Sequence, residues 1–248
     1  MNKRIQPREP FFMIPDRLIS EDGSLQLTEV ELYLYSLLLR KKNYEGVTET
    51  SITFLHESSP IEFGSSKQRS IDLIKSGLLS LMEKKVIRIC NSKREILLKN
   101  FKLINNDGEI IKDYKPSDLI IIIFGNSSLK GHTEIGYSKF DSFVSMSDYY
   151  IYCAVARWIN SGNGNFNCSY DRWARILQVT DKTAKTKVNE AVEREIIYKN
   201  IGNYKDEAVK GRTQKIQNVN AYRTTPFNNT EKTIMTKKQE IEKIEDMF

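Results

Sequence analysis

Apolar residues recur at helical spacing along several stretches of the chain, and short β-branched runs with a period of two follow them. One helix is predicted to begin at LTE (27–29), where Thr28 can cap it and an acid suits the helix dipole. A second is predicted 119 residues later at MSD (146–148), where Ser147 takes the capping place. The residues expected to face the core are Leu32, Tyr35, Leu38 and Leu39 in the first helix and Ile151, Val155, Trp158 and Ile159 in the second.

Two more helices and a strand are predicted in each half. A short capped helix begins after Ser51 and again after Ser169. The third helix lies in SSKQRSIDLIKSGLLSLMEKK in the first half and in TDKTAKTKVNEAVERE in the second, and a β-branched run follows each, at 86–89 and 196–198. The residues of the third helices that are expected to turn inward are Ile71, Ile74, Leu78, Leu81 and Met82, and Ala184, Val188, Ala191 and Val192.

A polar, basic turn then separates each run from another strand-like segment. The first turn spans 91–94, between VIRIC and EILL, and the second is a longer stretch that leads into KIQNVNAY. The lead-ins FFMIPDRLI and IGYSKFDSFV also correspond. The order helix, helix, helix, strand, basic hairpin, strand, found twice, is the plan of a winged helix-turn-helix. We therefore predict an α+β fold, mainly helical, with two tandem winged helix-turn-helix domains and a short C-terminal helix.

The predicted N-terminal domain spans residues 1–101 and the C-terminal domain spans 137–227. Between them, 102–136 is interpreted as an extended wing and linker, with a hairpin turn at NNDG (105–108) and a strand at LIIIIF (119–124) that is buried on both faces. The polar tail, 228–248, is predicted to be either a solvated helix or a contact for a partner. Its apolar residues at helical spacing are Ile234, Ile241, Ile244 and Phe248.

The net charge is +6 and the pI is near 9.0. The excess of basic residues lies in the two predicted domains rather than in the linker or the tail. A mild basic excess fits nucleic acid, an anionic membrane or no particular partner. No apolar run is long enough to span a bilayer, and MNKRIQPREP is not followed by a signal-peptide core, so we expect a cytoplasmic protein. The three cysteines are then expected to be reduced and mostly buried: Cys90, Cys153 and Cys168.

The third helix of a helix-turn-helix enters the major groove, and its first turns reach base edges and phosphates. Arg69 and Gln68 are residue types that bind guanine and adenine bidentately, whereas Lys67, Lys182 and Lys185 suit phosphates. Both helices also fit a plain surface helix of mixed charge, and the basic wing tips are either solvated or in contact with DNA. The candidate DNA-binding residues are Ser66, Lys67, Gln68, Arg69, Ser70, Lys75, Lys93, Arg94, Thr180, Lys182, Thr183, Lys185, Thr186, Asn189, Lys210 and Arg212.

Catalytic and metal-binding patterns are missing from the sequence. His56 and His132 lie far apart, and neither has a cysteine, histidine or acid at metal-ligand spacing. There is no Walker motif and no pair of carboxylates that stands out as catalytic. The aromatic residues Trp158, Trp173, Tyr33 and Tyr152 are expected in the core. The sequence thus favours a non-enzymatic binding protein without cofactor or metal.

The stretch from FFMIPDRLI through KQRSIDLIKSGLLSLMEKKVI (about 11–90) resembles the N-terminal winged-helix domain of replication initiators from plasmids of low-GC Gram-positive bacteria. Related helix-turn-helix proteins occur in phages and other mobile elements. The resemblance implies specific binding to origin DNA, recruitment of host replication proteins, and a recognition helix that carries Lys67, Gln68, Arg69 and Ser70. Those initiators often carry a different C-terminal domain, whereas this chain repeats the first one.

The expected function is sequence-specific binding of double-stranded DNA that starts replication of a plasmid or phage-like element, by a monomer or a homodimer. A transcriptional regulator or a partition protein of such an element needs the same DNA readout. A winged-helix adaptor or inhibitor that binds protein rather than DNA is the alternative of a different class.

Overall fold

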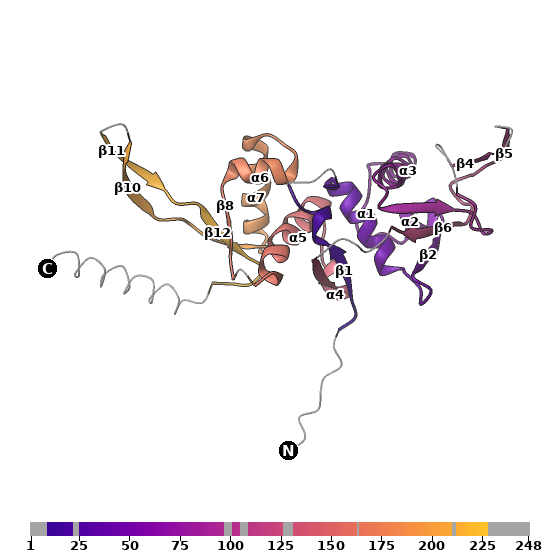
Figure 1. Cartoon of the computed structure of the whole chain (residues 1–248), viewed down its shortest axis with the longest axis horizontal. Coiled ribbons are helices and arrows are strands. Elements are labelled where there is room, and N and C mark those ends of the chain that lie inside the picture. The colour runs from indigo at the N-terminus through magenta and orange to yellow at the C-terminus, as the bar shows by residue number, and fades with distance from the viewer. Residues whose placement is uncertain are drawn as a thin grey trace, which may run out of the picture.

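The computed structural model describes residues 9–21, 25–96, 101–104, 109–125, 131–162, 164–209 and 212–227, with side chains outside 205–217. It is an α+β protein with small antiparallel sheets, as the sequence predicts (Figure 1). The predicted tail helix (228–248) and the predicted turn at 105–108 lie outside the described residues.

The elements of the N-terminal half include the three predicted helices, with a strand and a 3-10 helix before the first and one further strand between the first two. They are β1 (Phe11–Pro15), the 3-10 helix η1 (Asp16–Leu18), α1 (Glu29–Arg40), β2 (Val47–Thr50), α2 (Ile52–Glu57), α3 (Lys67–Glu83), β3 (Ile87–Cys90), β4 (Lys102–Ile104), β5 (Ile110–Asp113) and β6 (Ile120–Phe124).

The C-terminal half repeats this order element by element. It contains β7 (His132–Gly136), α4 (Tyr137–Asp141), α5 (Met146–Asn160), β8 (Phe166–Cys168), α6 (Tyr170–Leu177), α7 (Asp181–Glu193), β9 (Tyr198–Asn200), β10 (Tyr204–Val209), β11 (Arg212–Gln217) and β12 (Asn220–Arg223).

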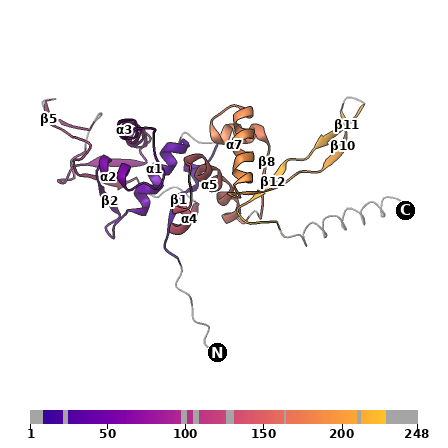
Figure 2. The ribbon, with the colours of Figure 1, turned by 180° about the vertical axis from the view of Figure 1, so that it is seen from behind.

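The sheets of the two halves have the same strand order. β6 lies between β2 and β3 in one sheet, and β12 lies between β8 and β9 in the other. The hairpins β4–β5 and β10–β11 stand between the second and third strands of each sheet and project at opposite ends of the molecule (Figures 1 and 2). The lead-in strands β1 and β7 pair with each other, antiparallel, so they join the two halves.

β6 is the central strand of the N-terminal sheet and not a linker between the halves. Its side chains are buried on both faces, as expected: Ile120 and Ile122 belong to the main core, whereas Ile121 packs with Val47 and Cys90. The segment 102–136 therefore supplies part of the N-terminal sheet, and residue 101 lies inside the N-terminal unit.

The first basic turn differs from the prediction. EILL was expected to return beside VIRIC, but β3 pairs along its length with β6. The described part of EILL ends at Ile96, which an isolated bridge joins to Cys90. The turn itself is held by the Asn91 side chain, whose Oδ1 accepts from the backbone N–H groups of Lys93 and Glu95. A longer excursion through β4 and β5 follows before the chain returns as β6.

The main hydrophobic core runs through both halves. It contains Leu32 and Leu38 of α1, Val155 of α5, Leu78 of α3 and Val188 of α7, all fully buried. Trp173 and Tyr33 are buried in it as expected, and Trp158 and Tyr152 pack against it half-buried. Where α1 meets α5, the Tyr149 hydroxyl donates to Ser36 Oγ at 2.6 Å. Since apolar burial is the main stabilising contribution to folding, the two halves are expected to unfold as one unit.

The helix caps correct the sequence alignment of the halves. Thr28 caps α1 as predicted, and its capping box includes Glu31. The cap of α5 is Ser145 and not Ser147, because Ser145 Oγ accepts from the backbone N–H of Asp148. The pattern Ser/Thr-x-x-acid therefore aligns Thr28 with Ser145 and Glu31 with Asp148.

Candidate nucleic-acid interface

The helices α3 and α7 occupy the same place in each half. Each follows a short helix, precedes the second strand of its sheet and begins at a hydroxyl cap, Ser66 or Thr180. Two residues after its end, each helix is followed by a residue at positive φ, Lys85 or Glu195, and the next residue donates its N–H back to the helix. The two C-terminal ends therefore correspond closely.

Measured from these matching ends, α3 extends further at its N-terminus. It has 17 residues and α7 has 13, so α3 is about one turn longer. In this register Ser70 corresponds to Thr180, and Lys67, Gln68 and Arg69 lie on the extra turn. The counterpart of Lys185 on α7 is Lys75 on α3.

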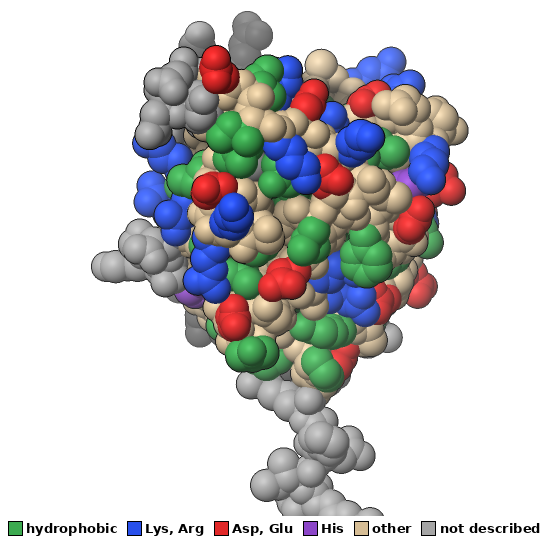
Figure 3. Space-filling model, turned by 90° about the vertical axis from the view of Figure 1, so that its right-hand side faces the viewer, with side chains coloured by type: hydrophobic (Ala, Val, Ile, Leu, Met, Phe, Trp, Pro, Cys, Tyr) green, Lys and Arg blue, Asp and Glu red, His purple; other side chains and the backbone are tan. Residues whose placement is uncertain are grey.

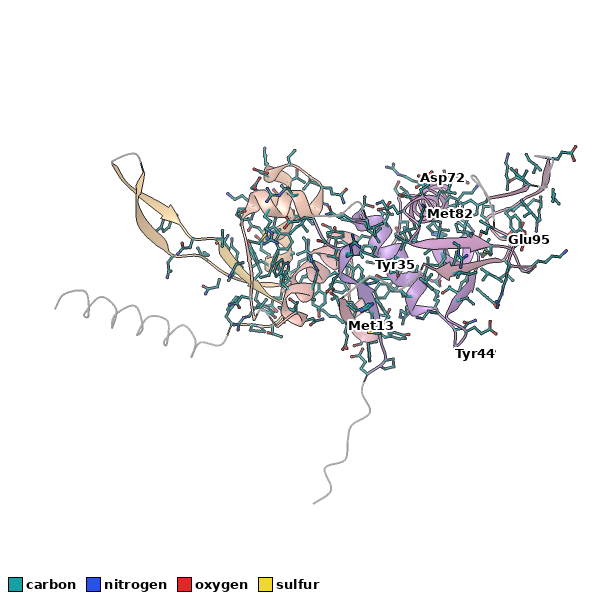
Figure 4. The ribbon with its side chains drawn as sticks, in the orientation of Figure 1. Met13, Tyr35, Tyr44, Asp72, Met82 and Glu95 are labelled. Atoms are coloured by element: carbon teal, nitrogen blue, oxygen red, sulfur yellow. The ribbon has the colours of Figure 1, made fainter. Side chains whose placement is uncertain are left out.

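The extra turn of α3 exposes polar side chains. Ser66, Lys67, Gln68 and Arg69 are all exposed, and Lys67 lies 3.7 Å from Glu57. Gln68 donates to Asp72 at 3.0 Å, and Asp72 lies on the outer side of α3 (Figure 4). The amide of Gln68 has a second N–H, so a ligand can accept from it while this bond remains.

The buried position of Ser70 contradicts the prediction that this residue contacts DNA. It is 1% exposed, and its hydroxyl donates to the carbonyl oxygen of Gly64. It lies on the core side of α3, although it directly follows a run of exposed polar residues in the sequence. Lys75 is half-buried, with its ammonium 5.8 Å from the centre of the Phe101 ring.

The candidate residues of α7 gather at its first two turns. Thr180 accepts from the backbone N–H of Thr183 as the cap, and Thr186 donates to the carbonyl of Lys182. Lys182, Thr183, Lys185 and Thr186 are exposed, whereas Asn189 is half-buried. Among the described residues no carboxylate forms an ion pair with Lys182 or Lys185.

The candidate residues of the two predicted wings differ in their surroundings. Lys93 is exposed, whereas exposed Arg94 lies 3.3 Å from Glu45 in the loop between α1 and β2. An Arg94 contact with DNA would therefore compete with an existing ion pair. Lys210 and the side chain of Arg212 lie outside the part that the structure describes.

A polar cluster surrounds Tyr170, the first residue of α6, which is not among the candidate residues from the sequence. The Tyr170 hydroxyl donates to Asn189 Oδ1 at 2.9 Å and accepts from Lys199 Nζ at 2.8 Å. Lys199 lies on β9, so three elements meet at this phenol. The only sequence signal was an aromatic residue directly after the cap Ser169, which also fits packing.

Charged side chains fix α7 and α6 against the N-terminal half. Lys187 of α7 lies 2.6 Å from Glu29 at the start of α1, and Arg172 of α6 lies 2.6 Å from Glu21. Gln26 also donates to the carbonyl of Ile176 at 2.7 Å. These contacts hold α6 and α7 in place against the N-terminal half.

Basic side chains do not form a separate patch on the face of the molecule in Figure 3. At the outer end of the N-terminal half, Figure 3 shows lysine and arginine mixed with acidic and apolar side chains. In Figure 1, α3, α6 and both hairpins lie on the upper side, and β1 and α4 lie below. The exposed polar residues of α3 and α7 therefore mark the candidate interface better than net charge does.

A cavity of about 580 Å³ lies between the lead-in strand and the N-terminal half. It is lined by apolar side chains such as Met13, Tyr35 and Phe124, with Lys42 and Lys85 also in its lining (Figure 4). Within the described residues, no group of three or more histidines, cysteines or acids is placed to hold a metal ion. No described helix is long and apolar enough to cross a membrane.

No protein-family model matches the sequence, and a search of curated proteins finds no match.

Proposed function

We propose that the chain is a sequence-specific double-stranded DNA-binding protein with two tandem winged helix-turn-helix units, which initiates replication of a plasmid or phage-like element. The observation that carries the proposal is the repeated topology. Besides a short lead-in helix, η1 or α4, each half has three helices and a three-stranded sheet, with a hairpin between the second and third strands in chain order. This is the plan of a winged helix, in which the third helix reads the major groove.

The third helices have the chemistry that this reading requires. The first turn of α3 exposes an arginine and a glutamine, Arg69 and Gln68, and the first turns of α7 expose Lys182 and Lys185. Arginine and glutamine discriminate bases, and lysines neutralise phosphates. The replication role rests on the resemblance of residues 11–90 to plasmid initiators. A transcriptional or partition role would use the same contacts.

The test is a selection of bound duplexes from a random library, followed by affinity measurements at several salt concentrations. A DNA-binding chain enriches a motif, and the logarithm of its affinity falls linearly with the logarithm of salt. The variant Lys182→Glu with Lys185→Glu should weaken binding strongly, whereas Lys139→Glu with Glu134→Lys, on the lead-in side, should not. A chain without a salt-dependent duplex affinity would exclude the proposal, and motifs in an origin or in a promoter separate replication from transcription.

The cavity beside β1 favours a second candidate, a winged-helix adaptor or inhibitor that binds protein. Its apolar lining includes lysines and no acid, which suits an amphipathic acidic segment of another protein. Met13→Asp would place a charge in this lining, where Met13 is half exposed. If the adaptor role is the main one, this variant abolishes partner capture, and the chain shows no motif in the duplex selection.

A further inference from the structure

Two lysines converge on Tyr170 at the junction of α6, α7 and β9. The ammonium of Lys199 lies 5.3 Å from the centre of the Tyr170 ring, and that of Lys185 lies 5.9 Å from it. Lys199 also donates to the phenol oxygen, and Asn189 accepts the phenol proton. Both hydrogen-bonding capacities of the phenol are thus used within the protein, and the ring is fixed in place.

Among the described residues neither Lys185 nor Lys199 is within ion-pair distance of a carboxylate. The acid nearest in sequence to Tyr170 is Asp171, which lies 2.5 Å from Arg175. Lys187 and Arg172 of the same half are, by contrast, paired with acids. Both ammonium groups lie within 5.9 Å of the centre of the same ring, and an anion that contacts both would be attracted by two positive charges.

We propose that Lys185 and Lys199 bind one phosphodiester group of a duplex, with Tyr170 and Asn189 as positioning residues. This inference rests on the proposed function and adds a specific phosphate site to it. An ammonium has three N–H donors, and Lys199 uses one on the phenol, so two remain for phosphate oxygens. Because Lys199 belongs to the sheet and Lys185 to α7, one phosphate held by both sets the seating of α7 in the groove.

The site predicts a specific effect of Lys199→Gln on duplex binding. Loss of one phosphate contact lowers the magnitude of the salt slope by about one and weakens target and non-target duplexes alike. Lys185→Gln should do the same. Tyr170→Phe keeps both ammonium groups but frees Lys199, so affinity should fall about threefold while the slope stays unchanged. The matched control is Lys139→Gln on α4, whose lysine also lies over aromatic rings.

The outcomes separate the site from the function. If the wild-type chain binds duplexes with a steep salt slope but Lys199→Gln and Lys139→Gln behave alike, the phosphate site is wrong and the function stands. If the wild type binds no duplex, both are wrong. Inorganic phosphate, titrated while the Tyr170 ring resonances are followed by NMR, tests the other source of this ligand. Millimolar phosphate that shifts the ring without any duplex binding would overturn the assignment to a phosphodiester. Urea unfolding of each variant, with unchanged free energy, supports binding rather than stability as the cause.

Discussion

The carboxylate of Glu31 lies 2.7 Å from the ammonium of Lys84, and the carboxylate of Asp148 lies 2.8 Å from the guanidinium of Arg194. Glu31 and Asp148 occupy the same position of α1 and α5, and Lys84 and Arg194 directly follow α3 and α7. Both acids are buried, with 6% and 0% of the residue exposed. A buried acid near the start of α1 therefore holds the end of α3, and a buried acid near the start of α5 holds the end of α7.

Replacing Lys84 with methionine should lower the free energy of unfolding by about 2 kcal/mol. Removal of one partner of a buried ion pair leaves an uncompensated charge, here Glu31, and the partial exposure of Lys84 reduces the usual cost. Urea unfolding gives the value. Lys85→Met is the matched control, because Lys85 is exposed, and its effect should stay below about 0.5 kcal/mol. Equal effects of the two substitutions would contradict this role of the pair.

The same pair predicts a loss of stability in acid. Burial alone would raise the pKa of Glu31, but hydrogen bonds from Lys84, Ser80 and the Thr28 backbone hold it below its usual value. The lowered pKa stabilises the fold fully above the unfolded value of about 4.3, and this contribution is lost as pH falls through the folded pKa. Unfolding at pH 7, 5, 4 and 3 should show a smaller loss for Glu31→Gln than for the wild type. Parallel curves would disprove the link.

The helices could be predicted from the sequence because their causes are local. Caps such as Ser66 and Thr180 and the apolar stripes of α3 and α7 lie within each segment. The register between the halves was harder to find. Alignment of Leu27 with Met146 pairs Thr28 with Ser147, whereas the helix cap that corresponds to Thr28 is Ser145. The extra turn of α3 becomes visible only when the C-terminal ends of α3 and α7 are aligned.

The pairings between distant segments could not be predicted. A strand such as β6 carries apolar residues that suit any buried sheet, and nothing local selects β2 and β3 as its neighbours. The contact of Glu29 with Lys187 joins residues 158 positions apart. The proposed phosphate site likewise needs Lys199 of β9 beside Tyr170 of α6, a proximity that only the folded chain provides.

Substitution of Tyr149 by phenylalanine should lower the free energy of unfolding by about 1 kcal/mol. The variant removes the buried hydroxyl that donates to Ser36 across the contact of α1 and α5, while Ser36 keeps its own bond to the Leu32 carbonyl. Thermal unfolding should still show one transition, because the hydrophobic core continues through both halves. Two separate transitions would instead indicate that the halves unfold independently. Tyr44→Phe is the control, since Tyr44 is 97% exposed.

The cysteines should resist alkylation in the folded protein. All three are buried, and burial raises the pKa of Cys153 and of Cys168 to about 12 and that of Cys90 to a lesser degree. The thiolate is the reactive form, so iodoacetamide at pH 8 should modify Cys153 and Cys168 on the order of a thousand times more slowly than free cysteine. Mass spectrometry with and without urea measures this. Rapid labelling without urea would show that α5 or β8 opens readily.

The extra turn of α3 allows the proposed base readout to be tested separately from packing. Arg69 is exposed on that turn, and neighbouring Ser70 is buried against Gly64. If the turn reads bases, Arg69→Ala should weaken binding to the selected duplex by about 1–3 kcal/mol and weaken unrelated duplexes less. Ser70→Ala should leave both affinities unchanged, since its side chain faces the core. Arg17→Ala, an exposed arginine on η1, controls for the loss of one positive charge. Competition binding with selected and scrambled duplexes distinguishes the three variants. Equal losses for Arg69→Ala and Arg17→Ala would show that the turn contributes charge alone and that base readout lies elsewhere.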